Sequence, residues 1–254
     1  MRGGPGLSRS LAEFLAAAVL LHFAYPLTLH GQAAELLYTL LYPVVVLLGV
    51  RVVRPPGRRL LPVAVLSVVF LFFGFWSALT PDQPLVRLGL FAAIVLFQGY
   101  VILQLLVFVF RYGKQHRQPH GPQLIMAAIC AYLLLGGVFA ALFGIIETLS
   151  PGAFENSLAP HRPVGWQDLT YLSFVTLVTL GYGDIVPVTP WARSLATGEA
   201  VAGTLFLTTV IARIVGAHVS PGGPSPSGPD LSGPEPTGPD PAGSPEAPGQ
   251  PGRA

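Results

Sequence analysis

Long apolar stretches alternate with short polar segments along the chain, and the lengths of these stretches predict its elements. A helix needs about 20 mostly apolar residues to cross the hydrocarbon core of a bilayer. Six stretches are long enough, and we expect six transmembrane helices at residues 11–29, 36–53, 60–79, 85–110, 124–149 and 191–215. The pattern is that of an all-α membrane protein.

A further apolar segment, residues 169–178, is too short to span. It lies between the fifth and sixth stretches and leads directly into a glycine-containing run. Irregular backbone at membrane depth is tolerated only where protein buries it or water reaches it. We therefore expect a re-entrant helix that dips into the membrane and ends in a segment enclosed by protein.

Composition supports a membrane protein and excludes several other classes. Hydrophobic residues make up 52% of the 254 residues and charged residues only 10%, which is too few for a soluble surface. A single cysteine, Cys130, excludes an intramolecular disulfide. The net charge of +2 gives no reason to expect a nucleic-acid partner. No nucleophile–base pair, metal cluster or phosphate loop is present in the sequence, so we expect neither an enzyme nor a bound cofactor.

The positions of the basic residues predict the orientation. Cytoplasmic segments carry an excess of Lys and Arg. Three residues lie on one side of the predicted spans, namely Arg87, Arg162 and Arg193. Nine lie on the other side: Arg2, Arg9, Arg51, Arg54, Arg58, Arg59, Arg111, Lys114 and Arg117. We therefore expect a multi-pass protein of the plasma membrane with both termini in the cytoplasm.

The first apolar stretch has a second interpretation. Gly31-Gln32-Ala33 resembles a small-residue cleavage site, so residues 11–29 are either a retained helix or a signal peptide. The length of the stretch and Glu13 within it favour a retained helix. The orientation of the remaining helices is the same in both cases.

The glycine-containing run after the re-entrant segment carries the candidate chemistry. Successive backbone carbonyls point the same way only if ordinary and left-handed conformations alternate, and Gly181 and Gly183 adopt positive φ without a Cβ clash. Four such strands around one axis replace the hydration shell of a potassium ion with carbonyl oxygens, and the Thr179 hydroxyl adds a further oxygen. Gly-Tyr-Gly alone would favour an ordinary turn, and the flanking residues favour an ion filter. The expected potassium ligands are Thr179, Leu180, Gly181 and Tyr182, within a run that ends with Gly183 and Asp184.

Residues 166–216 resemble the pore module of potassium channels, particularly the bacterial type with two transmembrane helices. The resemblance implies a hinge at Gly203 in the sixth helix. It also implies that Thr204, Leu207, Ile211 and Val215, which follow a helical spacing, line the central cavity. Periodicity alone would equally allow these four residues to face lipid. The chain departs from the family pattern in having Leu180 in place of a valine and Val178 in place of a threonine.

Further residues are expected to support the filter. The resemblance implies that Tyr171 and Phe174 form an aromatic cuff, and Val175 stands where some bacterial pores carry an acid. Asp184 follows the filter, and Asp168 is placed to cap the re-entrant helix. Glu199 lies within a span, where an acid costs about 2.5–3.5 kcal/mol at the centre. We expect it to face protein or water, and to bond the back of the filter or the re-entrant helix rather than an ion.

The first four predicted helices lack a voltage sensor. Such sensors carry several charges through the membrane field, whereas the fourth helix has Arg87 at its start and then no basic residue until Arg111. Polar residues within these spans, including His22 and Gln98, are expected to make interhelical hydrogen bonds. Arg51, Arg54, Arg58 and Arg59 are expected to lie near anionic lipid.

The sequence therefore predicts four regions. These are a cytoplasmic N-terminus (1–10), a four-helix membrane domain (11–118), a pore domain (119–217) and a Pro/Gly-rich disordered tail (218–254) without a ligand-binding domain. We expect a potassium-selective channel in which each chain joins three identical subunits and gating depends weakly on voltage. The alternatives are a non-selective cation channel and a sensory or scaffold membrane protein with a vestigial pore.

Overall fold

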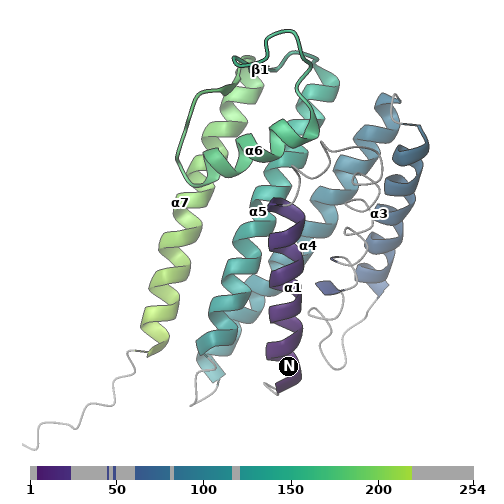
Figure 1. Cartoon of the computed structure of the whole chain (residues 1–254). Coiled ribbons are helices and arrows are strands. Elements are labelled where there is room, and N and C mark those ends of the chain that lie inside the picture. The colour runs from purple at the N-terminus through teal and green to yellow at the C-terminus, as the bar shows by residue number, and fades with distance from the viewer. Residues whose placement is uncertain are drawn as a thin grey trace, which may run out of the picture. The chain divides into compact units, whose positions relative to one another are not determined.

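The computed structural model describes residues 5–23, 45, 48–49, 61–80, 83–115 and 121–218 (Figure 1). The helices are α1 (Pro5–Phe23), α3 (Leu61–Leu79), α4 (Pro84–Gln115), α5 (Gly121–Leu149), α6 (Trp166–Leu177) and α7 (Pro190–His218). The strands are β1 (Phe154–Asn156) and β2 (Ile185–Pro187). The described part of the chain is mostly helical, as the apolar pattern predicts.

Three of these helices contain segments that are long and apolar enough to cross a membrane. The segments are Pro84–Phe110, Pro122–Leu149 and Pro190–Arg213, which match the fourth, fifth and sixth predicted spans. A shorter apolar segment, Ala64–Ser77, lies within α3. The six-span count stays a prediction. The second span (36–53) lies largely outside the described residues, as do Arg51, Arg54, Arg58, Arg59, residues 31–33 and the tail.

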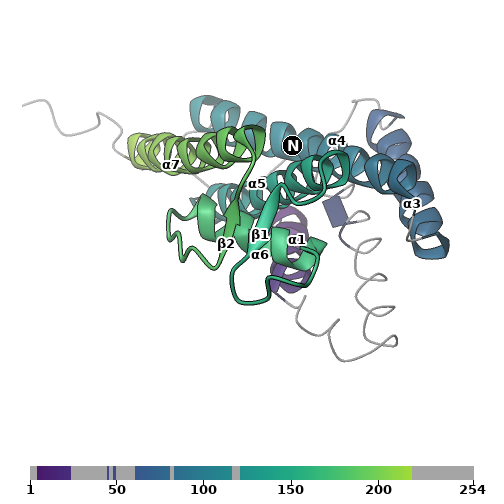
Figure 2. The same ribbon diagram turned by 90° about the horizontal axis from the view of Figure 1, so that it is seen from above.

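Helix α5 is the centre of the arrangement (Figure 2). Helix α4 packs along it and is contacted in turn by α3, while α1, α6 and α7 also contact α5. The shared core includes Phe14 of α1, Phe97 and Val101 of α4, and Leu134 of α5. These side chains are apolar and buried, so α1 and α4 are held to α5 by packing.

The two ends of the helical arrangement differ. The start of α1, the end of α4, the start of α5 and the end of α7 lie together, and α6 with the two strands lies at the opposite end (Figure 1). Arg9 is near the start of α1 and Arg213 near the end of α7. Arg213 was not counted when orientation was predicted, and it adds a basic residue to the end that also carries Arg9.

The strands are a departure from the all-α prediction. β1 and β2 pair antiparallel, with Phe154 opposite Pro187, Glu155 opposite Val186 and Asn156 opposite Ile185. The physical reason is local, because extended backbone in the connection after α5 and in the segment after Asp184 needs partners for its N–H and C=O groups. The pairing ties the connection after α5 to the segment that follows Asp184.

Candidate functional site

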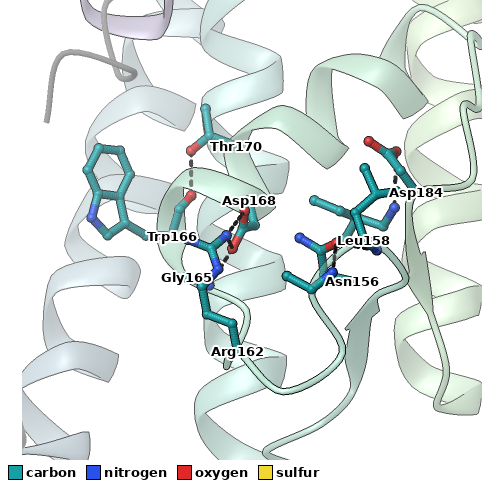
Figure 3. A network of polar contacts seen from close by, with 10 residues as sticks. Asn156, Leu158, Arg162, Gly165, Trp166, Asp168, Thr170 and Asp184 are labelled. Carbon is teal, nitrogen blue, oxygen red and sulfur yellow. Dashed lines mark hydrogen bonds and ion pairs between the residues drawn. The ribbon is translucent and has the colours of Figure 1, made fainter. Parts of the chain in front are cut away.

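The start of α6 is anchored by charged and polar contacts (Figure 3). Asp168, in the first turn, accepts a hydrogen bond from the N–H of Gly165 at 2.9 Å. Its two carboxylate oxygens lie 2.6 and 2.7 Å from one terminal nitrogen of Arg162. A carboxylate at a helix N-terminus also interacts favourably with the helix dipole. Asp168 thus caps α6 as the sequence predicts, and Arg162 fixes the carboxylate.

The end of α6 turns directly into the glycine-containing run. The N–H of Leu180 donates to the carbonyl of Val175 at 2.8 Å, and the N–H of Gly181 points to the same oxygen at 3.4 Å. The N–H of Thr179 donates to Thr176 O at 2.9 Å. In the part of the chain that the structure describes, no N–H or O–H donates to the carbonyls of residues 179–183. The N–H groups near the start of the run are therefore hydrogen-bonded back to α6. The carbonyl oxygens of the run remain available to bind another group.

The backbone of this run alternates in conformation. φ is +57° at Thr179, +60° at Gly181 and +80° at Gly183, while Leu180 and Tyr182 between them have ordinary negative values. The alternation turns successive carbonyls toward one side. The positive φ predicted for both glycines is confirmed, and a Cβ added at either would meet no atom within 4 Å. Glycine is therefore required at these positions because of the positive φ, and not because a larger side chain would clash with its surroundings.

Thr179 is the residue that sequence reasoning missed in this backbone pattern. Positive φ is unusual for a β-branched residue and indicates a strained position. The signal was available, because the period-two spacing of Gly183 and Gly181 extends back to Thr179. The threonine is thus the first member of the alternating series.

The side chains of the run face outward from the single chain. Leu180 is 52% exposed and Tyr182 66% exposed. Beyond them the chain is fixed again, since Asp184 Oδ1 accepts from the N–H of Ile185 at 3.0 Å and Asp184 O accepts from the N–H of Ser157 at 2.8 Å. The run is held at both ends while two large side chains between them are uncovered.

Helix α7 approaches the end of α6 very closely at Gly203. A Cβ added there would lie 2.4 Å from the carbonyl oxygen of Leu177. The same oxygen accepts a hydrogen bond from the Tyr132 hydroxyl of α5 at 3.1 Å. Gly203 was expected as a hinge. Helix α7 continues through that position without a break. The close approach to Leu177 O is a further reason for a glycine there, because no larger residue fits.

Glu199 is buried behind α6. Its residue is 0% exposed, and Oε1 lies 2.5 Å from the hydroxyl oxygen of Ser173. The Ser173 hydroxyl also lies 2.7 Å from the carbonyl oxygen of Gly136 in α5. A group on the re-entrant helix was one of the two partners expected for Glu199. Ser173 itself was missed, although a serine within the short apolar segment is a visible signal.

The two aromatic residues expected to form a cuff lie in different surroundings. The ring of Phe174 packs on α5, where a Cβ at Gly136 would come within 2.8 Å of it. It also lies 5.3 Å from the His22 ring and 5.6 Å from the Phe23 ring of α1, measured between centroids. Tyr171 packs beside the cluster that includes Phe143 and Phe154. Val175 is buried, and its carbonyl accepts from the N–H groups of Leu180 and Gly181. The cuff stays a prediction.

Helix α7 is covered on one side only. The buried side includes Ala192, Ala196, Glu199, Gly203 and Val210. The predicted cavity residues Thr204, Leu207 and Ile211 are exposed, and the side chain of Val215 lies outside the described residues. In the most apolar 18-residue stretch of each helix, 22% of α7 is buried, against 50% of α5. The predicted cavity face is therefore uncovered in the single chain.

Polar side chains also occur where α1, α4 and α5 meet. Gly137 leaves room for the amide of Gln98 and the ring of His22, which would lie 2.5 and 2.7 Å from a Cβ there. His22 Nδ1 bonds Ala18 O of its own helix at 2.8 Å, whereas Gln98 Oε1 is buried without a partner among the described residues. For neither residue does the structure describe the expected interhelical hydrogen bond.

One side chain joins the far ends of α4 and α7. Arg213 donates from a terminal guanidinium nitrogen to Phe110 O at 3.0 Å. No role was predicted for Arg213 from the sequence. An arginine in the last turns of the final apolar helix was the available signal.

Comparison with known proteins places the second half of the chain in a family. Residues 127–219 match the model of a family described as ion channel. The chain is 38% identical over 74 residues to "Potassium channel protein kcv" of Paramecium bursaria Chlorella virus 1, covering 28% of this chain and 78% of that protein.

Two further similar proteins are longer. "Two pore potassium channel c" of Oryza sativa subsp. japonica is 34% identical over 97 residues, which are 37% of this chain and 19% of that protein. "Inward rectifier potassium channel Kirbac3.1" of Paramagnetospirillum magnetotacticum is 32% identical over 81 residues, which are 32% of this chain and 26% of that protein. The chain therefore spans about a fifth to a quarter of the length of these two relatives.

Proposed function

The chain belongs to the family of potassium channels that share this pore module, and from that premise we propose that it is the pore-forming subunit of a potassium-selective channel. One observation carries the proposal. Positive φ at Thr179, Gly181 and Gly183 alternates with ordinary φ, and the carbonyls of this run accept no hydrogen bond from the described residues. Rings of such carbonyls replace the hydration shell of potassium.

The proposed assembly is a homotetramer. One chain supplies one filter strand, and a closed ring of four strands surrounds an ion with oxygens. The exposure of Leu180 and Tyr182 and the uncovered face of α7 support neighbours on both sides of the strand. Heterologous contacts that close on themselves produce such a ring.

The proposed membrane layout has six spans, with α6 and the filter entering from outside the cell. The three membrane-length segments and the position of α6 at the end opposite the start of α1 support it. Both termini are then cytoplasmic, at the plasma membrane. Arg51, Arg54, Arg58 and Arg59 lie on the cytoplasmic side, where anionic lipid attracts basic residues.

The proposed gating is weakly dependent on voltage. Helix α4 carries Arg87 in its first turn and no further basic residue until Arg111. Voltage acts on charge at about 2.3 kcal/mol per elementary charge per 100 mV, so a helix with little charge gains little from the field. Helices α1, α3 and α4 then serve as a scaffold around the pore.

A flux measurement tests the proposal. The purified chain is reconstituted in liposomes loaded with potassium, which are diluted into a medium that contains only a large impermeant cation. A proton carrier lets protons enter as cations leave, and a pH-sensitive dye reports this entry. We expect rapid exit from potassium-loaded liposomes and slow exit from sodium-loaded ones. Equal exit of both ions would favour a non-selective channel, and no exit above protein-free liposomes would favour a vestigial pore.

A further inference from the structure

Three oxygen atoms from three helices meet behind the filter. The hydroxyl oxygen of Ser173 in α6 lies 2.5 Å from Glu199 Oε1 of α7 and 2.7 Å from Gly136 O of α5. The first distance is shorter than that of a normal hydrogen bond between oxygens, and the second is typical of one. Each of the two contacts therefore needs its own proton.

The count of protons decides the state of the acid. Gly136 O is a carbonyl and carries no proton, and the Ser173 hydroxyl carries one. If Glu199 were ionised, that one proton would have to serve two acceptors, and one contact would be an oxygen–oxygen repulsion. We infer that Glu199 carries the second proton on Oε1 and acts as a neutral acid that positions α6. The carboxyl donates to Ser173, and the Ser173 hydroxyl donates to Gly136 O.

The surroundings of Glu199 support the neutral form. The residue is fully buried, and Oε2 has no hydrogen-bond partner among the described residues. The ion pairs Arg9–Glu13 and Arg162–Asp168 do not involve Glu199, so neither supplies a cation to it. A buried carboxylate without a counter-charge is strongly disfavoured, whereas a neutral carbonyl oxygen without a partner costs far less.

The titratable group that faces Glu199 from α5 is Tyr132, and it offers the acid no proton. Its hydroxyl proton is used in the bond to Leu177 O. From α6 the facing group is the Ser173 hydroxyl, which does not titrate in the ordinary range. The proton on the carboxyl is therefore the one that completes the chain of bonds.

The chain of bonds acts on the filter through α6. Ser173 lies two residues before Val175, whose carbonyl accepts the amides of Leu180 and Gly181. Fixing Ser173 to both α5 and α7 fixes the axial position of that carbonyl. Glu199 is thus a positioning residue that does not touch the ion. This effect on selectivity rests on the proposed function, whereas the presence of the proton does not.

Infrared difference spectroscopy of the full-length reconstituted chain tests the proton directly. At neutral pH we expect a carboxylic acid C=O band that is absent in Glu199→Gln and shifts to lower frequency after exchange into D2O. Asp168→Asn is the matched control, because Asp168 is ion-paired with Arg162, and it should leave the band in place. A parent spectrum in which Glu199→Gln removes no acid band would overturn the inference, whether or not the protein conducts.

Ser173→Ala tests the donor direction without removing the acid. The variant leaves Oε1 without its acceptor, so the acid C=O band should move to higher frequency and stay sensitive to D2O. An unchanged band in Ser173→Ala would contradict the bond from Glu199 to Ser173. This variant also covers the case in which substitutions at Glu199 prevent assembly.

Selectivity measurements test the positioning role. Glutamine has the same shape and a carbonyl, and its N–H group can donate in place of the acid O–H, so Glu199→Gln should retain the preference for potassium over sodium within about twofold. Glu199→Ala, which leaves Ser173 without the α7 contact, should reduce that preference by about tenfold. Full selectivity in an assembled Glu199→Ala variant would show that the acid does not position the filter.

Discussion

The pore half of the chain and its first helices are built from different kinds of contact. In the pore half, side chains and turns are fixed by specific hydrogen bonds, among them those from the Tyr132 hydroxyl to Leu177 O and from the Gly165 N–H to the Asp168 carboxylate. Helices α1, α3 and α4 instead meet α5 through apolar side chains such as Phe14 and Phe97. The family match covers residues 127–219, which is the half with the specific contacts.

The difference follows from what each half has to position. Backbone carbonyls must point in set directions to replace water around an ion, and only a few residue types allow the required φ values. Apolar helices pack in many equivalent ways, and volume and shape are all that their contacts require. The pore half is therefore expected to be intolerant of small changes that the first helices accept.

The largest contrast is expected between two glycines of the two halves. Gly183→Ala should abolish selective current, because alanine at a φ of +80° is strained by about 1–3 kcal/mol. Gly99→Ala in α4 should retain it, because a Cβ there also meets no atom within 4 Å and the helical φ suits alanine. The potassium current of each purified variant in planar bilayers is the measurement.

The glycine pair separates strain from crowding, since neither position is crowded. Normal selective current in Gly183→Ala would mean that the positive φ is not needed for conduction. Loss of current in both variants would mean that the first helices are as intolerant as the filter.

The next contrast concerns the contact of α7 with α6. Gly203→Ala should sharply lower the fraction of the proposed tetramer, because its Cβ would lie 2.4 Å from a backbone oxygen that cannot move alone. Overpacking of this kind costs about 1–3 kcal/mol. Size-exclusion chromatography in mild detergent measures the fraction. Gly198→Ala on the same helix meets nothing within 4 Å and is the control. Equal tetramer fractions in the two variants would show that the close approach is not limiting.

The features that could be predicted from the sequence also differ between the two halves. The filter and its glycine conformations were predicted because positive φ selects glycine almost uniquely. The positive φ of Thr179 was not predicted, because only its period-two spacing from Gly181 and Gly183 indicates it and threonine itself disfavours that conformation. The contact of Gly203 with Leu177 O was not predicted either, because a distance between two elements leaves no residue pattern. The expected membrane helices 85–110, 124–149 and 191–215 followed from apolar length alone.

The partners of individual side chains were the features least predictable from the sequence. From its cost in a membrane, Glu199 was predicted to face protein or water, and the structure shows it buried against protein. Its partner Ser173 was not predicted, because that contact depends on how α6 is rotated against α7. Arg213 was passed over, and its bond to Phe110 O joins residues 103 positions apart. Contacts over such sequence separations require the packed fold.

A smaller effect is expected from one hydrogen bond at the end of α6. Tyr132→Phe removes the donor to Leu177 O, and such a bond contributes about 0.5–1.5 kcal/mol. For a chain of this size 1 kcal/mol corresponds to a shift of about 2–4 °C in the thermal midpoint. Thermal unfolding of the detergent-solubilised protein measures the shift. An unchanged midpoint would mean that the Tyr132 contact adds nothing to stability.

The smallest effect is expected in the first helices. Arg87→Gln should leave the gating charge unchanged at about one or two charges per tetramer, obtained from the limiting slope of open probability against voltage. The account assigns the arginine no role as a moving charge. A parent value of about a dozen charges, reduced in Arg87→Gln, would show that helices α1, α3 and α4 sense voltage.

The central claim is that the backbone run 179–183 selects potassium, and the reversal potential tests it most directly. The purified full-length chain is recorded in a planar bilayer with potassium on one side and an equal concentration of sodium on the other. The account predicts a reversal potential displaced strongly from zero, with potassium carrying the current in one direction and almost no sodium current in the other. A reversal potential at zero, with currents of equal size in both directions, would contradict it.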